Sequence, residues 1–418
     1  MKTFRKNDFK ICIVGMGYVG LPLAARFAYK NFNVLGFDIN EERLKQLRKN
    51  NDINNDISVE LLKVFTKNSL LTSDIQDIKE CNIFIITVPT PINSDKTPDL
   101  RPIIGASNLI GSILKEGSLV IYESTVYPGV TDEICTPVLE KQSQLIHNIN
   151  FSTGYSPERI VPGDKKNTIE KITKVVSASN SDALEVISFI YSSIIDAGIH
   201  IAPSIKVAEA TKVTENIQRD VNIALINEMH KLYKSLDIDT LEVIEAASTK
   251  WNFMKIKPGL VGGHCISIDP YYLMHKSQLS GFNPKLMNTA RVINDTMSEW
   301  VFEEFLKYAN DLNLDLKKIE VCFLGYSFKE DCSDIRNTKI IDLLLLAKDH
   351  NLNISLWDPI VSIKDLEDIR GMGIKIYKEA PYDLDLFFLC VPHTPIKKFL
   401  KSHKGHVYDY RSFNKIKE

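Results

Sequence analysis

The feature that most constrains the fold lies near the start of the chain, where an apolar run is followed at once by closely spaced glycines. Residues 11–14 (ICIV) are typical of a buried parallel strand, and Gly15, Gly17 and Gly20 precede a helical pattern that continues to Phe27. A G-x-G-x-x-G sequence between a strand and a helix permits a tight turn, close approach of a ligand to the backbone and close packing of the helix. We therefore expect an α/β domain that opens with a dinucleotide-binding turn. The same site is predicted to include the intervening residues Met16, Tyr18 and Val19.

A carboxylate ends the second predicted strand, which lies in NVLGFDIN and stops at Asp38. A carboxylate in this position accepts hydrogen bonds from ribose hydroxyl groups and repels a 2′-phosphate. We therefore expect the cofactor to be NAD rather than NADP. Arg43 on the following helical stretch weakens that preference slightly if it contacts the cofactor, and the alternative is a surface arginine.

Strand and helix patterns alternate through the first half of the chain. Further apolar strands are predicted in residues 82–90 and 118–125, and continuous apolar strands separated by helices are typical of a parallel, doubly wound sheet. From Lys206 to about Leu236 the pattern changes to one long helix without glycine or proline. Two more helices are predicted after it, at 240–247 with Asp239 as N-cap and at 285–308.

The β/α pattern returns after Lys317, with apolar strands in residues 317–329, 353–359 and 385–392. The chain is therefore predicted to have an α/β fold. Two Rossmann-like domains with doubly wound parallel sheets would be joined by a central all-α domain with one long helix. The predicted boundaries are 1–203 for the NAD-binding domain, 204–312 for the central helical domain and 313–418 for the second Rossmann-like domain.

Composition argues against several classes of protein. The 418 residues carry a formal net charge of -2, so there is no basic excess for nucleic acid. No segment reaches the roughly 18 apolar residues of a membrane span, and the N-terminal apolar run is too short for a secretory signal, so we expect a cytoplasmic protein. Seven cysteines without a C-x-x-C pair argue against disulfides and a structural zinc, and no metal is expected.

One cysteine stands in a glycine-rich stretch, KPGLVGGHCISIDPYY (257–272), unlike the cysteines in apolar runs. A buried structural cysteine is the plain interpretation of Cys265. Beside a hydride acceptor, however, a thiolate can add to an aldehyde, give a thiohemiacetal and, after loss of hydride, a thioester that water hydrolyses. That chemistry requires the thiol pKa to fall from about 8.5 in a local positive field.

The ends of the third and fourth strands carry further candidates. Pro89 and Thr90 lie in VPTP, and Thr125 lies in ESTVYPG. Because ligands in open α/β sheets bind beyond the carboxyl ends of the strands, these residues would face the cofactor and the substrate. On position alone, a loop hydroxyl that caps a nearby turn is an equal alternative for each threonine.

Several motifs occur together in a fixed order: GMGYVG, VPTP, ESTVYPG, YSPERIVPG, a long helix with Lys212 and Asn216, GGHCISIDP and GYSFKEDCSDIRNT. In this order they resemble the nucleotide-sugar 6-dehydrogenases, the UDP-glucose/GDP-mannose dehydrogenase family, from about residue 9 to 412. The resemblance implies a four-electron oxidation of a sugar C6 alcohol to a carboxylate, with two NAD⁺ reduced and Cys265 as nucleophile. Lys212 would stabilise the oxyanion at C6 and Asn216, four residues on, would orient it.

The resemblance also assigns residues to the hydrolytic step. Glu158 matches the glutamate that handles water, Asp269 matches a general base or a group that positions water, and Thr125 matches the threonine that holds this water or the C6 oxygen. A second glutamate of the UDP-glucose pattern is replaced by Pro162, which leaves the hydrolytic base open. His264 precedes the cysteine, either as its activator or in a sugar-binding or structural role.

The sequence PGLVGGHC followed by IDPYYL resembles the UDP-N-acetylhexosamine 6-dehydrogenases of bacterial surface polysaccharide pathways. This branch implies UDP-N-acetylglucosamine as first substrate, then its galacto epimer, with UDP-glucose or GDP-mannose third. The C-terminal unit resembles the UDP-binding domain. Lys329 and Arg336 are assigned to the cofactor, and the predicted substrate residues are Arg159, Lys212, Asn216, Lys250, Trp251, Asn252, Phe253, Gly262, His264, Tyr326, Phe328, Lys329 and Arg411.

The resemblance further implies a homodimer formed through the central helices, with Lys250 as a possible donor to the neighbouring sugar site. Two other classes are kept open. A two-electron hydroxyacid dehydrogenase shares the N-terminal fold and a helix lysine, but needs neither Cys265 nor a second nucleotide-binding unit. A nucleotide-sensing regulator on the same scaffold would bind NAD without oxidising a sugar, and the thiol, lysine and carboxylate set argues against it.

Overall fold

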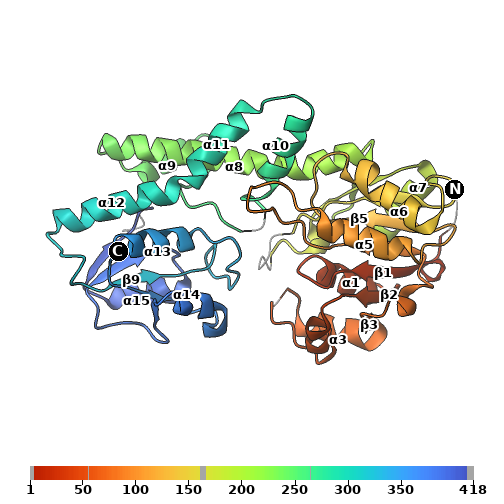
Figure 1. Cartoon of the computed structure of the whole chain (residues 1–418), viewed down its shortest axis with the longest axis horizontal. Coiled ribbons are helices and arrows are strands. Elements are labelled where there is room, and N and C mark those ends of the chain that lie inside the picture. Colours follow the sequence, from red (N-terminus) through yellow and green to blue (C-terminus); the bar gives the residue numbers. More distant parts are fainter. Residues whose placement is uncertain (1–3, 55, 161–165, 264, 412–418) are drawn as a thin grey trace. The chain divides into compact units, whose positions relative to one another are not determined.

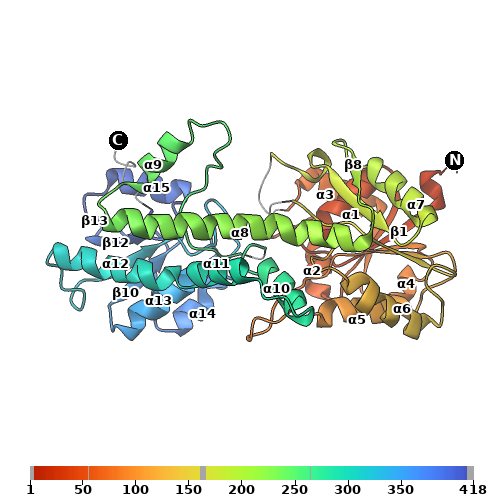
Figure 2. The ribbon, with the colours of Figure 1, turned by 90° about the horizontal axis from the view of Figure 1, so that it is seen from above.

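The computed structural model describes residues 4–54, 56–160, 166–263 and 265–411. Two compact units are formed. Unit 1 contains the chain up to Glu215 together with Tyr271–Phe282, and unit 2 contains Asn216–Pro270 together with the chain from Asn283 onward. Helix α8 (Ile205–Ser235) begins in unit 1 and ends in unit 2, and Figure 2 shows it as one unbroken helix. The long central helix expected from the sequence is thereby confirmed.

Unit 1 is built on a sheet with the strand order β3-β2-β1-β4-β5-β6-β7-β8 (Figure 1). All neighbouring strands run parallel except β6 and β7, which run antiparallel. The strands are β1 (Lys10–Val14), β2 (Asn33–Phe37), β3 (Leu70–Thr72), β4 (Ile83–Ile86), β5 (Leu119–Tyr122), β6 (Ser152–Tyr155), β7 (Lys174–Ala178) and β8 (Ile199–Ile201). The helices are α1 (Gly20–Tyr29), α2 (Glu41–Arg48), α3 (Val59–Asn68), α4 (Ile75–Ile78), α5 (Arg101–Gly111), α6 (Thr136–Ser143) and α7 (Ser181–Ser192), with the short turns η1 (Lys6–Asp8), η2 (Thr131–Cys135) and η3 (Ile169–Lys171).

Unit 2 contains the central helices and a second parallel sheet in the order β11-β10-β9-β12-β13. Its strands are β9 (Val321–Leu324), β10 (Ile354–Trp357), β11 (Lys375–Ile376), β12 (Leu386–Leu389) and β13 (His406–Tyr408). The helices are α9 (Thr240–Ala247), α11 (Lys285–Asp295), α12 (Met297–Asp311), α13 (Ile340–Asp349), α14 (Glu367–Gly371) and α15 (Thr394–Ser402), with the turn η4 (Ile363–Leu366). Numbered along the chain within each unit, the first five strands of both sheets follow the same order, 3-2-1-4-5, which confirms the prediction of two Rossmann-like sheets.

Local sequence patterns predicted some of the helices correctly and others incorrectly. Asp239 caps α9 as expected, since its side chain accepts hydrogen bonds from the N–H groups of Leu241 and Glu242. The single helix expected over 285–308 is wrong, because α11 ends at Asp295 and α12 begins at Met297. A helix was also missed: α10 (Asp269–Leu279) starts at the aspartate of the GGHCISIDP motif.

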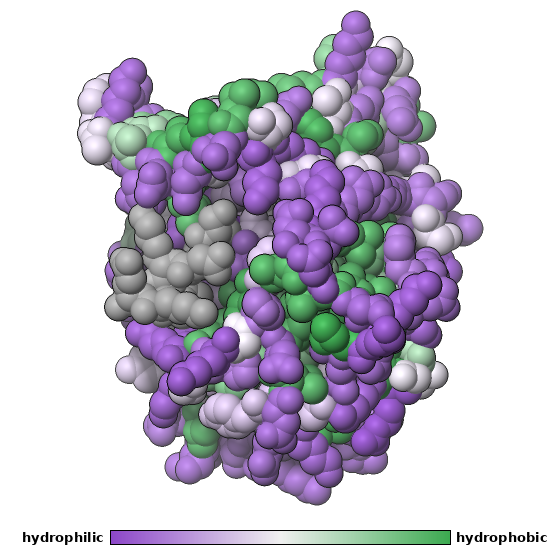
Figure 3. All heavy atoms as spheres, turned by 90° about the vertical axis from the view of Figure 1, so that its left-hand side faces the viewer, coloured by the Kyte–Doolittle hydropathy of each residue, from purple (hydrophilic) through white to green (hydrophobic). Residues whose placement is uncertain are grey.

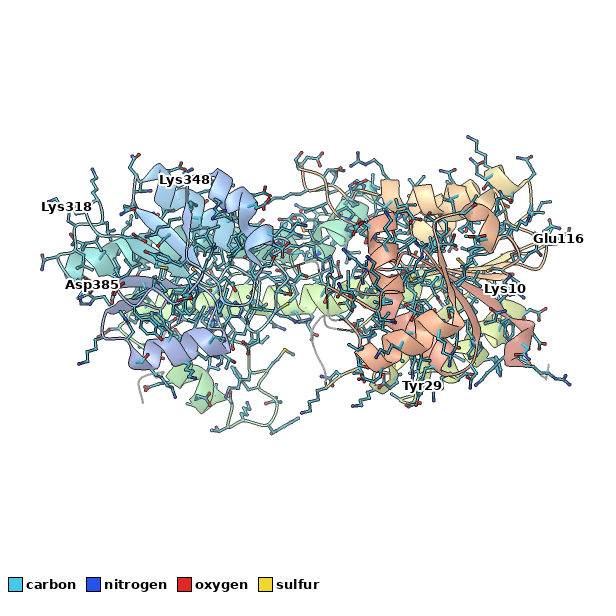
Figure 4. The ribbon with its side chains drawn as sticks, turned by 90° about the horizontal axis from the view of Figure 1, so that it is seen from below. Lys10, Tyr29, Glu116, Lys318, Lys348 and Asp385 are labelled. Carbon is cyan, nitrogen blue, oxygen red and sulfur yellow. The ribbon has the colours of Figure 1, made fainter. Side chains whose placement is uncertain are left out.

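The apolar strands lie in the cores of their units. Every residue of β4, β5, β9, β10 and β12 is buried, as expected for strands covered on both faces of a parallel sheet. Figure 4 labels Lys10 at the amino end of β1 and Glu116 before β5, which marks one end of the unit 1 sheet. The carboxyl ends of β1, β4 and β5 therefore share the opposite end, where the predicted cofactor residues follow.

Candidate active site

The glycine turn after β1 has the geometry that a dinucleotide needs. Gly15 has a φ of +100°, and a Cβ added to Gly20 would lie 1.9 Å from the carbonyl oxygen of Gly15 and 2.5 Å from Thr87 Oγ1. Gly20 therefore allows α1 to approach β1 closely. A Cβ on Gly17 would meet no described atom within 4 Å, so the backbone there is open to an approaching pyrophosphate. The turn fits NAD.

The acid and the arginine beside this turn are both held in place. Asp38 accepts hydrogen bonds from the N–H groups of Met16 (2.7 Å) and Asn40 (2.8 Å), one on each oxygen, which leaves further lone pairs for ribose hydroxyls. The alternative of a surface arginine is wrong for Arg43, which is buried. Its Nε donates to Met16 O at 3.0 Å and its Nη1 pairs with Asp52 at 2.8 Å. The guanidinium thus braces the turn.

The loops after β4 and β5 lie at the same sheet end and are tied to one another. Ser124 Oγ donates to the carbonyl oxygen of Val88 at 2.6 Å. Pro89 is exposed, and Thr90 and Thr125 are half-buried, so the three predicted residues keep part of their surface open at this end. Their contact with a cofactor or substrate stays a prediction.

Glu158 belongs to a buried cluster that the sequence did not reveal. Its Oε2 pairs with Lys174 Nζ at 2.9 Å, and the same Nζ lies 2.7 Å from Glu123 Oε2. The Tyr191 hydroxyl donates to the other oxygen of Glu123. Burial raises the pKa of Glu123, whereas Lys174 and the backbone N–H groups outweigh burial and lower the pKa of Glu158. Glu158 is therefore held as an anion.

A second buried acid, Glu209, was also missed. It lies on α8, and its two oxygens accept the backbone N–H groups of Gly129 (2.5 Å) and Thr131 (2.9 Å). Burial raises its pKa from 4.5 to about 7, although these two hydrogen bonds act against the rise. Glu209 joins the loop that carries Thr125 to the turn of α8 that carries Lys212, three residues further on.

The two predicted polar residues of α8 are buried, so the alternative of a solvated lysine is wrong. Lys212 lies in the unit 1 part of the helix and Asn216 in the unit 2 part. Asn216 Nδ2 donates a hydrogen bond to Asp269 Oδ2 at the first residue of α10. The structure thus brings together two of the predicted catalytic residues of unit 2.

Cys265 starts the turn that leads into α10. Its carbonyl oxygen accepts the N–H groups of Ile268 (3.1 Å) and Asp269 (2.8 Å), and its side chain is half-buried. Cys265 thus lies about one helical turn before Asp269, the first residue of α10. Cys265, Asp269 and Asn216 therefore form one local constellation within unit 2. His264 and Pro162 lie outside the described residues.

The glycines before the cysteine pack against the segment that follows β9. A Cβ on Gly262 would lie 2.6 Å from the carbonyl oxygen of Asn337, and one on Gly263, whose φ is +85°, would lie 2.9 Å from the Phe328 ring. Lys329 Nζ lies 5.5 Å from the centre of that ring. The predicted residues Gly262, Phe328 and Lys329 are thus neighbours.

A buried acid at the end of β10 organises the loop after β9. Asp358 Oδ2 accepts the N–H of the predicted residue Tyr326 at 2.7 Å and lies 3.1 Å from His393 Nε2. The other ring nitrogen of His393 accepts the N–H of Asp331 at 2.9 Å. Asp358 and His393 therefore hold the two ends of the segment 326–331.

Other predicted residues are engaged elsewhere. Arg336 bonds to Asp334 through Nε at 2.9 Å, Arg411 Nε donates to the Tyr410 hydroxyl at 2.7 Å, and Arg159 pairs with Glu215 at 2.7 Å. The segment with Lys250, Trp251, Asn252 and Phe253 is exposed, and Trp251 keeps 93% of its surface open. A sugar-lining role for this segment stays a prediction.

Two negative findings concern the described residues alone. Within them, no group of three or more histidine, cysteine, aspartate or glutamate side chains could hold a metal ion. No helix in the same part of the chain combines the length and the hydropathy that a membrane crossing requires.

Three sequence profiles of one family match consecutive segments of the chain. The NAD-binding domain of the UDP-glucose/GDP-mannose dehydrogenase family matches residues 9–195, its central domain matches 206–296 and its UDP-binding domain matches 322–415. The chain belongs to this family. It is accordingly an NAD-dependent oxidoreductase of nucleotide sugars, as the glycine turn, Asp38 and the GGHC motif predicted.

Relatives resemble this dehydrogenase over nearly their whole length. The UDP-N-acetyl-D-glucosamine 6-dehydrogenase of Pseudomonas aeruginosa is 49% identical over 392 residues, which cover 94% of this chain and 92% of the relative. The enzyme of the same name from Salmonella typhi is 44% identical over 99% of this chain and 95% of its own. Among solved structures, a UDP-D-ManNAc dehydrogenase from Pyrococcus horikoshii is 27% identical with a TM-score of 0.86, covering 96% and 95% of the two chains.

Proposed function

We propose that the protein oxidises the C6 hydroxyl of a UDP-N-acetylhexosamine, with UDP-N-acetylglucosamine as first choice, to the uronic acid. The relatives named for that substrate are 44% to 49% identical to this chain. The observation that carries the chemistry is the constellation of unit 2. In it the backbone N–H of Asp269 donates to the carbonyl oxygen of Cys265, and the Asn216 amide donates to the Asp269 carboxylate.

The proposed reaction has three stages. The C6 alcohol loses a proton and a hydride to give an aldehyde, and the Cys265 thiolate adds to this carbon to give a thiohemiacetal. A second hydride loss converts the thiohemiacetal into a thioester. Water then attacks the thioester carbon, the C–S bond breaks, and the products are the carboxylate and the thiolate. NAD, when bound, accepts one hydride in each of the two oxidations.

The chain's own polar groups have matching roles. Buried Lys212 would stabilise the oxyanion that develops at C6, and Asn216 would orient that oxygen. Asp269 is the proposed base for the hydrolytic water, because it lies one helical turn beyond Cys265 and its carboxylate is oriented by Asn216. Glu158 and Thr125 would orient the water rather than take its proton, since both Glu158 oxygens already accept hydrogen bonds.

We further propose a homodimer formed through the central helices. Leu225 and Leu232 are exposed on α8 and lie two turns apart on one face, and Trp251 is exposed near α9. Figure 3 views the molecule from the side of α9 and α12, where hydrophobic residues interrupt a mostly hydrophilic surface. Light scattering on the purified protein measures the mass, and a value close to the 47.4 kDa of one chain would contradict the dimer.

A cytoplasmic location and a role in surface polysaccharide synthesis belong to the same proposal. They require the uronic acid to be the product in living cells. Loss of that nucleotide sugar from extracts of a deletion strain, and its recovery with the intact gene, checks both the product and its use.

The deciding experiment counts NADH per sugar consumed with UDP-N-acetylglucosamine, UDP-N-acetylgalactosamine, UDP-glucose and GDP-mannose in separate reactions. We expect two NADH per N-acetylhexosamine in the wild type and no complete oxidation in Cys265→Ala. Cys332→Ala is the matched control, because that cysteine is also half-buried in unit 2. One NADH per substrate would indicate a two-electron dehydrogenase, and NAD binding without any NADH would indicate the regulator.

A further inference from the structure

Lys174, a buried lysine of unit 1, pairs with Glu158 beside the antiparallel strands β6 and β7. Strands β6 and β7 run antiparallel, with Gly154 facing Ala178 and Tyr155 facing Ser177. Strand β6 ends at Tyr155, and three residues later the Glu158 side chain reaches Lys174, the first residue of β7. The 2.9 Å ion pair therefore joins the segment after β6 to the start of the neighbouring strand.

The contacts of Glu158 fix both of its oxygens. Oε1 accepts the N–H groups of Arg159 (2.6 Å) and Ile160 (2.7 Å), and Oε2 accepts Lys174. Lys174 also pairs with Glu123, so two carboxylates share one ammonium in a nearly enclosed site, where Glu158 keeps 7% of its surface exposed. If Lys174 were absent, two like charges would face one another without a cation, which is a costly arrangement in a protein interior.

We propose that Lys174 is a positioning residue for the hydrolytic half of the reaction. It holds Glu158 in one orientation as a carboxylate, and one lone pair of Glu158 remains for the hydrolytic water that the proposed function assigns to this residue. In this step the water O–H bond breaks, the O–C6 bond forms and the C6–S bond breaks. The proton passes to Asp269 and the thiolate leaves. This inference rests on the proposed function.

The role predicts a defect in hydrolysis alone. Both hydride transfers precede hydrolysis, so Lys174→Met should still release a rapid burst of two NADH per subunit. Steady-state turnover should then fall by about 10- to 100-fold, the effect of a misplaced reacting group. Intact mass spectrometry should show the sugar attached to the protein, and the attachment should be absent in Lys174→Met/Cys265→Ala. Lys171→Met is the control, because Lys171 is exposed in the same region, and it should behave as wild type.

A second variant distinguishes a role of Lys174 in positioning Glu158 from a role in neutralising the buried charge. Lys174→Met/Glu123→Gln removes one positive and one negative charge, so the buried cluster keeps the net charge of the wild type. If Lys174 serves only to neutralise charge, this double variant should recover full turnover, which would overturn the proposal. If Lys174 positions Glu158, the double variant should fold well and still stop after the burst.

Two further outcomes also decide the question. A burst that shrinks in parallel with turnover would show that the first oxidations suffer equally, and would contradict a role in hydrolysis. Wild-type protein that forms fewer than two NADH per sugar would refute the proposed function, whereas normal wild-type stoichiometry with full turnover in Lys174→Met would refute this inference alone.

Discussion

The buried acid on α8 makes the stability of unit 1 depend on pH in a way that one substitution can reveal. Glu209 has no exposed surface, and its pKa is raised from 4.5 to about 7 by burial. A tenfold change in proton affinity is worth about 1.4 kcal/mol, so the difference between the two values corresponds to about 3 kcal/mol. The folded chain binds this proton more tightly than the unfolded chain. The contribution of Glu209 is therefore greatest below pH 4.5, falls as pH rises from 4.5 to 7, and is lost above 7.

Glu209→Gln removes this titration and keeps the size of the side chain. The amide, like the protonated acid, is uncharged, so at pH 5 the variant and the wild type should differ only by the hydrogen bond that the amide loses. At pH 8 the wild type carries the ionised group, and the variant should gain about 2.5 kcal/mol relative to it. The amide nitrogen of the variant cannot accept a hydrogen bond, so one of the two backbone N–H groups loses its acceptor. This loss lowers the free energy of unfolding by about 1 to 3 kcal/mol at every pH. The sign of the difference is therefore less informative than its change with pH.

The assay is urea unfolding followed by far-UV circular dichroism at pH 5, 6, 7 and 8. The quantity of interest is the free energy of unfolding of the variant minus that of the wild type at each pH, because the other titrating groups cancel. Glu228→Gln, on an exposed position of the same helix, is the control and should give a flat line. A difference for Glu209→Gln that stays within about 0.5 kcal/mol from pH 5 to pH 8 would refute the reasoning.

Two further predictions concern the cofactor turn. Gly20→Ala should abolish NAD binding measured by calorimetry, because the new Cβ would lie 1.9 Å from a backbone oxygen. Gly105→Ala in α5, where a Cβ meets no described atom within 4 Å, should leave binding intact. Arg43→Ala should lower the free energy of unfolding by about 3 to 5 kcal/mol, because the nearly buried Asp52 loses its ion pair. Arg48→Ala, which removes an exposed pair with Glu41 and a hydrogen bond to the carbonyl oxygen of Leu71, should cost only about 1 to 2 kcal/mol, and equal losses in the two variants would contradict the argument.

Sequence patterns predicted those parts of the molecule that are encoded by neighbouring residues. The glycine turn, Asp38 and the long α8 each depend on a short stretch whose spacing is sufficient. The break between α11 and α12 at Thr296 could not be read this way, because neither glycine nor proline marks it and the helical pattern continues across it. Helix α10 was missed because the residues after Cys265 were interpreted for their chemistry, although a proline near the first turn favours a helix start.

The buried charged residues could not be predicted from neighbouring residues in the sequence. Lys174 finds its partners 51 and 16 residues away, and Glu209 finds its partners 80 and 78 residues away. Viewed alone, a lysine at the start of an apolar strand and a glutamate on a polar helix are typical of solvated side chains. Only the assembled sheet shows that they are enclosed.

The repeated strand order of the two sheets places an acid at the same point twice. Asp38 follows β2 and Asp358 follows β10, and each accepts an N–H from the loop after the first strand, that of Met16 or Tyr326. Asp38 keeps part of its surface open, whereas the Asp358 side chain is fully enclosed and contacts His393. The two sheets therefore place an aspartate at equivalent positions with different roles. The partly exposed Asp38 can contact a ligand, whereas the enclosed Asp358 stabilises the loop after β9. The second half must therefore recognise its nucleotide without a ribose-reading carboxylate at that strand end.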